Sequence, residues 1–267
     1  MVTYLDSHSV SAEYAFWQME EQKVRAFLLT TNRGMDAWLS DQWDAAEVRA
    51  NEIFDPEAHD GGLVAEIYED RIGLWPTDYF WQLSSAVVKD AVALYEIFLE
   101  TLANQVLGRA GHRLSTLDTE DSWRWPEYKS FYTHYVGVDV ASDDIESVLW
   151  IRNKLAHLRD GLRTETGRAE FASHVEQLGL DGPETAEEQP LGLVDHAPYM
   201  THGVFLTQLQ TWRLLDLIAV QVGKVALAAF PFIYGRQTSA HLEALRLGTP
   251  LAAPDLTVKQ VQKYFVR

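Results

Sequence analysis

The chain has 267 residues, of which 39 are acidic and 22 are basic, so its formal net charge at pH 7 is 22 − 39 = −17. This balance argues against broad, non-specific binding to nucleic acid or to anionic membranes, while a small local basic site stays compatible with it. The absence of cysteine excludes disulfides, thiolate metal sites, iron–sulfur clusters and a cysteine nucleophile. The N-terminus lacks a basic start followed by an apolar run, so we expect no signal peptide and a cytoplasmic protein.

The N-terminal part of the chain has helical spacing. We predict helix from Ser11 to about Phe54, with a break into two helices at Gly34. The apolar residues that recur along it are Tyr14, Trp17, Val24, Phe27 and Leu28. A loop at 54–62, rich in Pro and Gly, and a short element from Leu63 to Tyr68 follow.

A long apolar helix is predicted over about 79–107. Thr77 or Asp78 is expected to cap its start, and Gly108 and Gly111 are expected to end it. Its stripe, with spacings of three and four, consists of Leu83, Val87, Ala91, Leu94, Tyr95, Phe98, Leu102 and Val106.

An aromatic connector, Trp123 to Tyr135, separates this helix from the next. Pro126 prevents an unbroken helix there, so we predict a short helix from Glu127 to about Tyr135. Ser142 then caps a helix whose first turn is acidic, which suits the partial positive charge of a helix N-terminus. Its apolar face is made of Val148, Ile151, Leu155 and Leu158, and Gly161 is a plausible stop.

The C-terminal part contains the most apolar stretch, Leu214 to Ile233. Asp216 and Lys224 interrupt it, so we interpret it as a buried core helix and not a membrane span. The last long helix is predicted from about Thr201 to Ala229. The acidic segment at 178–198 is predicted to be a mobile loop, and the tail after Pro231 to hold one helical turn at Val258 to Phe265.

Because helical spacing dominates and alternation of period two is scarce, we predict an all-α protein, a bundle of four principal helices with an N-terminal helical extension. The expected division is 1–75 for the extension, 76–236 for the bundle and 237–267 for a C-terminal tail.

The segment with the strongest candidate catalytic residues is 148–159, late in the predicted helix that Ser142 caps. Asn153 and His157 are four residues apart and can touch, whereas Arg152 and His157 are five apart, about 140° around an ideal helix. Arg152 and His157 converge on one ligand only if the last turn distorts or a second copy supplies one of them. A guanidinium grips phosphate, and a neutral imidazole takes a proton near pH 7, a pairing that suits phosphodiester cleavage without a metal.

The bare spacing of Arg and His is common by chance. It also occurs at Arg168/His174 and at Arg236/His241. The pair Arg152/His157 differs because it lies on a clear helix, with Asn after Arg and Ala before His. A structural alternative is that both side chains cap the helix C-terminus, where cations are favoured.

This segment resembles the signature of HEPN-domain proteins, small helical bundles of prokaryotic defence and toxin systems. The signature is Arg, then a polar residue such as Asn, then His after four to six residues, and this chain matches it at Arg152, Asn153 and His157. The order of a long apolar helix, an aromatic connector, the motif helix and a final long helix is also similar. The resemblance covers roughly 78–230.

The resemblance implies a metal-independent endoribonuclease without cofactors, in phage defence or toxin–antitoxin control. The motifs of two protomers would meet in a homodimer, and the 2′-hydroxyl of RNA would attack the neighbouring phosphate to leave a 2′,3′-cyclic phosphate. His157 would be the general base or acid, Arg152 would stabilise the developing charge, and Asn153 would orient His157 or contact phosphate. A defence or antitoxin protein is a possible partner.

Two features depart from this pattern. The tyrosine that some toxin members carry shortly after the His is absent here, so that form of control is not supported. The charge of −17 is unusual for a protein that cuts RNA, and a local basic strip offsets it only in part. That strip consists of Arg152, Lys154, Arg159, Arg163 and Arg168. We assign substrate binding to Lys154, Arg159 and Arg163; the alternative is a solvated helix end.

A second hypothesis for the protein is a catalytically inactive helical module that binds a partner protein or a nucleotide.

Other residues are weaker candidates. Glu96 and Glu100 would support Arg152 or His157 if they face the motif helix. His196 and His202, with Asp195 beside the first, flank a loop, but scattered histidines are usually not ligands, so no metal site is predicted. Trp123 and Trp125 could stack on bases, although most tryptophans belong to the core.

Overall fold

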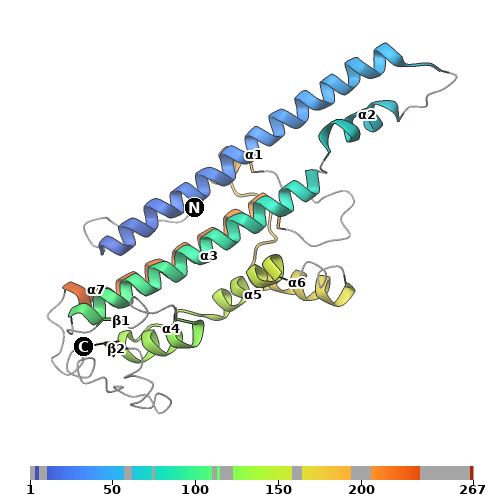
Figure 1. Cartoon of the computed structure of the whole chain (residues 1–267). Helices are drawn as coiled ribbons and strands as arrows, with labels where there is room; N and C mark the ends of the chain where they lie inside the picture. The colour runs from blue at the N-terminus through green and yellow to red at the C-terminus, as the bar shows by residue number, and fades with distance from the viewer. Residues whose placement is uncertain are drawn as a thin grey trace. The chain divides into compact units, whose positions relative to one another are not determined.

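Helices make up nearly all the regular structure of the computed structural model, which describes residues 4–5, 11–56, 62–73, 76–109, 113–114, 123–157, 164–193, 206–234 and 265–266. The all-α prediction is therefore confirmed (Figure 1). One antiparallel pair of two-residue strands, β1 (Arg113–Leu114) and β2 (Phe265–Val266), accompanies the helices.

Helix α1 (Ala12–Ile53) is continuous over 42 residues, so the predicted break at Gly34 is wrong. A glycine inside a helix costs only about 1 kcal/mol relative to alanine, and the helix-forming residues on both sides outweigh that cost. Tyr14, Trp17 and Leu28 are buried as expected, whereas Phe27 is exposed.

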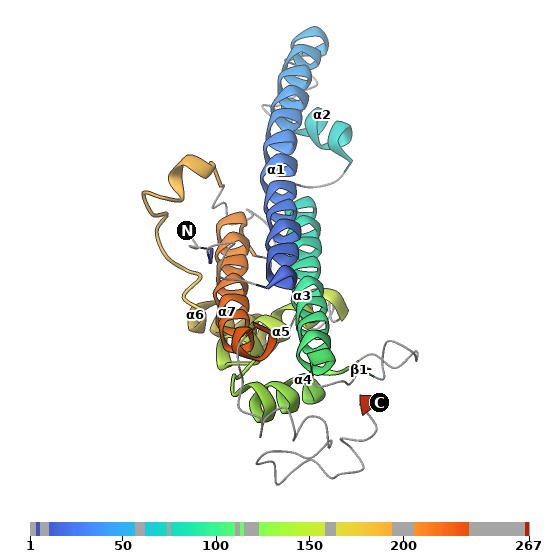
Figure 2. The same ribbon diagram turned by 90° about the vertical axis from the view of Figure 1, so that its left-hand side faces the viewer.

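Helix α2 (Leu63–Ile72) returns beside the C-terminal part of α1 (Figure 2). The ring of Tyr68 packs against Trp43 with centroids 5.2 Å apart. The Nε of Arg71 donates to Gln42 Oε1 at 3.2 Å. The helix ends at Gly73, whose φ of 60° is the left-handed conformation that glycine adopts without strain.

Helix α3 (Pro76–Arg109) carries the predicted apolar stripe, and all of its eight residues except Leu94 are buried. The predicted ends are wrong. Thr77 and Asp78 lie inside the first turn because the helix already begins at Pro76, a residue suited to the first helical position. Gly108 lies inside the last turn, and Gly111 lies outside the described residues.

The aromatic connector forms α4 (Trp125–Phe131) followed by one π-helical turn, η3 (Tyr132–Val136), close to the predicted short helix. Two buried hydroxyls tie this region to α3. Tyr132 Oη donates to the carbonyl of Leu99 at 2.6 Å, and Tyr95 Oη donates to the carbonyl of Val140 at 2.7 Å. Burial raises the pKa of both hydroxyls, so both stay protonated donors.

Helix α5 (Asp143–His157) begins where predicted, and the amide of Glu146 donates to the Ser142 carbonyl at 2.8 Å. Its predicted apolar residues Val148, Ile151 and Leu155 are buried, while Leu158 and Gly161 lie outside the described residues.

The sequence analysis missed α6 (Glu165–Gln177). Thr164 caps it by accepting a hydrogen bond from the amide of Gly167 at 3.0 Å, and Phe171 and Val175 are buried.

Helix α7 (Gln208–Tyr234) begins later than predicted, since residues 206–207 are not helical, and Pro231 lies inside it near its end. Within the described residues, 208–233 is the one stretch long and apolar enough to cross a membrane, and half of its most apolar window is buried in the protein. Core helices share this composition, so the stretch is weak evidence for a membrane span. Leu214, Ile218 and Val222 are buried, as the core-helix interpretation requires. The turn predicted at 258–265 falls almost entirely outside the described residues.

The chain folds into two compact units. Unit 1 comprises residues 1–22, 89–153 and 214–267, and unit 2 comprises 23–88 and 154–213. Helices α1, α3, α5 and α7 each contribute residues to both units, so the units are interleaved along the chain. The three consecutive ranges expected from the sequence divide the chain differently.

Candidate functional site

Arg152 is the centre of the candidate site, in the second half of α5. Its Nη1 donates to Asn153 Oδ1 at 2.9 Å, and its Nη2 lies 3.8 Å from Glu96 Oε2 on α3. The side chain is 27% exposed, so it is partly sheltered but open to solvent. Asn153 and Glu96 thus hold the guanidinium in place within unit 1.

The guanidinium of Arg152 is under-satisfied. Its Nε is buried and makes no hydrogen bond to any residue that the structure describes. A buried donor without an acceptor costs about 1–3 kcal/mol, and such groups call for a functional or structural explanation. The remaining N–H groups suit an anion that presents two oxygens, as phosphate does.

Glu96 is itself held by Trp125. The indole Nε1 of Trp125 donates to Glu96 Oε1 at 2.8 Å, so one carboxylate oxygen faces α4 while the other faces Arg152. The Trp125 ring packs on Tyr95 and Tyr128, with centroids 5.8 and 5.9 Å away. Sequence reasoning offered Glu96 as a support for Arg152 or His157 but missed Trp125 as its anchor, because no local pattern links positions 29 residues apart.

The surroundings of Glu96 are acidic. Burial raises the pKa of the nearby Tyr128 hydroxyl, and the charges of Glu100, Glu96 and Glu127 raise it further. Glu100 thus adds negative charge near Tyr128, and its support of Arg152 or His157 stays a prediction. Arg152 is the cation that faces this acidic surface within the described part of α5.

His157 ends α5, and its side chain lies outside the described residues. The backbone is α-helical up to His157, so positions 152 and 157 lie about 140° apart around the axis. The sequence analysis gave two ways for Arg152 and His157 to meet: a distorted last turn, or a second copy of the helix. The last turn of α5 is not distorted as far as His157, so the first way is not observed.

The predicted phosphate-binding cations are only partly described. Lys154 Nζ lies 3.7 Å from Glu170 Oε2 on α6, and Glu170 is 52% exposed. Lys154 itself is 22% exposed, so the pair is exposed only on the side of Glu170 and contributes little by itself. Arg159 and Arg163 lie outside the described residues.

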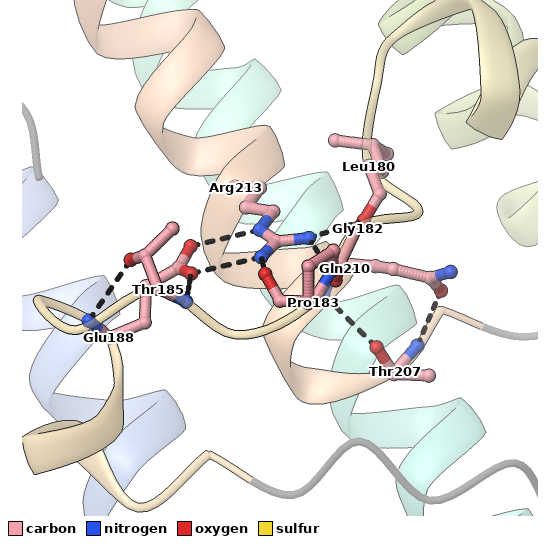
Figure 3. A network of polar contacts seen from close by, with 8 residues as sticks. All are labelled: Leu180, Gly182, Pro183, Thr185, Glu188, Thr207, Gln210 and Arg213. Carbon is pink, nitrogen blue, oxygen red and sulfur yellow. Dashed lines mark hydrogen bonds and ion pairs between the residues drawn. The ribbon is translucent and has the colours of Figure 1, made fainter.

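A second arginine, Arg213 on α7, offers a direct contrast (Figure 3). Its Nε and Nη2 donate to the two oxygens of Glu188 at 2.8 and 2.9 Å. Its Nη1 donates to the carbonyls of Leu180 and Gly182, and its Nη2 also to that of Pro183, each at 2.9 Å. All five N–H groups are thus used inside unit 2, which marks Arg213 as a structural clamp and not a ligand site.

This clamp contradicts the predicted mobile loop for the part of 178–198 that the structure describes. The hydrogen bond from Arg213 is the main cause that lowers the pKa of Glu188, to about 2, with Thr185 adding to the shift. The loop residues 180–188 are held against α7, and the short helix η5 (Gln189–Leu191) follows. Sequence reasoning missed this because the arginine lies 25 residues beyond its partner Glu188.

The remaining candidates do not form a site among the described residues. Trp123 is 6% exposed and packs against Tyr128 and Phe131, so it belongs to the core and is closed to base stacking. Asp195, His196 and His202 lie outside the described residues. No cluster of three or more potential metal ligands occurs in the part of the chain that is described.

Comparisons of the chain with protein families, with curated proteins and with solved structures found no match.

Proposed function

We propose that the protein is a metal-independent endoribonuclease with a HEPN-like bundle, built around Arg152, Asn153 and His157. The observation that carries the proposal is the state of Arg152, which Asn153 and Glu96 hold in place while its buried Nε has no acceptor among the described residues. The resemblance of the motif to HEPN proteins supplies the reaction type. Phage defence or toxin–antitoxin control is the matching biological role.

In the proposed reaction the 2′-hydroxyl of RNA loses its proton to His157 acting as general base. The 2′-oxygen forms a bond to the adjacent phosphorus, and the bond from phosphorus to the 5′-oxygen breaks. A proton returned by an imidazolium completes the 5′-hydroxyl, and the other product ends in a 2′,3′-cyclic phosphate. Arg152 stabilises the charge that develops on the phosphate oxygens.

The site is proposed to form in a homodimer. Because α5 keeps helical geometry through His157, one chain places positions 152 and 157 on different sides of the helix. A two-fold symmetric pair of α5 helices would let Arg152 of one protomer and His157 of the other approach the same phosphate. Lys154, Arg159 and Arg163 would then contact the RNA backbone.

The experiment that tests the site compares Arg152→Ala with Arg168→Ala. Arg168 on α6 stands before His174 with a similar spacing, so it is a control with the same chemistry in a different setting. We expect Arg152→Ala to abolish RNA cleavage and Arg168→Ala to retain it, with the helical circular dichroism of both unchanged. Equal activity of the two variants would remove Arg152 from the site.

The second candidate is a catalytically inactive helical module that binds a partner protein or a nucleotide. The observation that favours it is the carboxylate of Glu96, which already neutralises Arg152 and would repel RNA phosphates. This candidate predicts no cleavage of any RNA by the parent protein, and binding of a partner that survives Arg152→Ala.

A further inference from the structure

The exposed side of α1 in unit 2 has an unusual composition. Phe27 is 47% exposed, Trp38 is 40% exposed and Val48 is 61% exposed. Phe27 and Trp38 are 11 residues apart, which is three turns, and therefore lie about 20° apart around the helix. Three large apolar side chains thus lie exposed along one side of α1 at spacings of 11 and 10 residues, an arrangement compatible with an interaction surface.

Acidic residues share this side. Asp41 and Glu52 are exposed and lie, by helical register, between Val48 and Trp38 around the axis. We call the five residues Phe27, Trp38, Asp41, Val48 and Glu52 the outer face of α1. The buried residues Leu28 and Asn32 lie on roughly the opposite side of the helix, and α2 covers α1 through Gln42 and Trp43. None of these contacts covers the outer face.

The surface around the outer face is negatively charged, which excludes some classes of partner. The described residues 27–56 and 62–72, which include the outer face, carry nine acidic and three basic residues. RNA and anionic membranes are repelled by such a surface. A second copy of α1 would bring the same acidic residues together, whichever direction it ran, and so lacks charge complementarity.

We propose that the outer face of α1 docks a basic amphipathic helix of a partner protein. Apolar side chains of that helix would cover Phe27, Trp38 and Val48. Its lysines or arginines would pair with Asp41 and with Glu52, whose exposed ion pair with Arg49 at 3.0 Å is weak enough to exchange. This arrangement is the helix-on-helix mode of peptide recognition, with anchors spaced by whole turns. The charge pairs would mainly set the rate of association and the choice of partner.

The probe is a fluorescein-labelled peptide of 18 residues, helical, with leucine along one face and lysine on both flanks. Its binding to the full chain is followed by fluorescence anisotropy at low ionic strength. We expect binding by the parent protein that falls at least tenfold in Trp38→Ser and in Asp41→Lys. A peptide with glutamate at every lysine position is expected not to bind.

Two matched variants carry the same changes elsewhere. Leu227→Ser replaces an exposed apolar residue of α7, and Glu176→Lys reverses an exposed charge on α6. Both are expected to bind the lysine peptide as the parent does. A loss in these variants as large as in Trp38→Ser or Asp41→Lys would overturn the proposal, and so would equal binding of the glutamate peptide.

Sedimentation velocity tests the other possible occupant of the outer face, a second copy of this chain. If Trp38→Ser converts a dimer of the parent into monomers, and the lysine peptide does not bind, a second copy covers the face and the proposal is wrong. Because the outer face contains none of the proposed catalytic residues, Trp38→Ser is expected to cut RNA like the parent, so this proposal and the proposed function stand or fall separately.

Discussion

Arg213 and Arg152 differ in how many of their N–H donors already have acceptors. This difference distinguishes a structural arginine from a candidate binding site. Arg213 donates all five of its N–H groups, to the carboxylate of Glu188 and to three backbone carbonyls. Arg152 is held by Asn153 and Glu96, and its buried Nε finds no acceptor in the described part of the chain. Only the second arrangement leaves donors for a phosphate, which is why the proposed function rests on it.

The role of Glu96 is tested by Glu96→Gln. The amide keeps an acceptor for Trp125 but removes the negative charge beside Arg152. We expect KM for RNA to fall roughly threefold, since phosphate meets less repulsion, and kcat to fall as well because Arg152 is held less firmly. Steady-state kinetics on a short RNA measures both, with the exposed Glu176→Gln as control. Unchanged kcat and KM would show that Glu96 does not act on Arg152.

The Arg213 clamp predicts a stability that depends on pH. The pKa of Glu188 falls from 4.5 to about 2 on folding, so the stabilisation is complete above pH 4.5 and is lost as the pH falls from there toward 2. Glu188→Gln removes this contribution, about 3 kcal/mol at pH 7. Urea unfolding at pH 7, 5 and 4 measures it.

The difference between parent and Glu188→Gln should shrink once the pH drops below 4.5. Glu52→Gln is the matched control, because the pair of Glu52 with Arg49 is exposed and contributes little. A constant difference at every pH would mean that the clamp acts through packing and not through the ionised carboxylate.

Among the elements, α1 offers a simple route to higher stability. Gly34 lies inside the helix, and a Cβ there would meet nothing within 4 Å. Gly34→Ala is therefore expected to stabilise the protein by about 1 kcal/mol, which raises Tm by roughly 2–4 °C. Differential scanning calorimetry measures the shift. A lower Tm would show that α1 needs the glycine to bend or to approach another chain.

Sequence periodicity predicted the long helices better than their ends. The stripe of α3 and the start of α5 follow from apolar spacing and an acidic first turn, which are local signals. The continuity of α1 past Gly34 and the extension of α7 past Pro231 were missed, because a long helix tolerates one unfavourable residue when the residues around it favour the helix.

The candidate site was predictable only in part, for the same reason. Arg152 and Asn153 are adjacent in sequence, so their contact is local, and helix order placed Glu96 near them. The bond from Trp125 to Glu96 and the clamp from Arg213 to Glu188 join residues 29 and 25 positions apart. Such contacts depend on how the elements fold together, which spacing along one helix does not reveal.

For the molecule as a whole, the central expectation is a site shared by two chains. Arg152→Ala and His157→Ala are each expected to be inactive alone. When the two variants are mixed and allowed to exchange subunits, half of the dimers are mixed and each has one intact site of two, so about a quarter of the parental activity should return. No recovery, in a mixture shown to exchange subunits, would place both residues in a site within one chain.

The most direct measurement is cleavage of RNA in the presence of EDTA, with analysis of the product ends, by the parent, His157→Ala and His174→Ala. The account predicts that the parent and His174→Ala cut RNA and leave 2′,3′-cyclic phosphate ends, while His157→Ala does not cut. Cleavage that requires a divalent metal, or that persists undiminished in His157→Ala, would contradict a metal-independent nuclease centred on this motif.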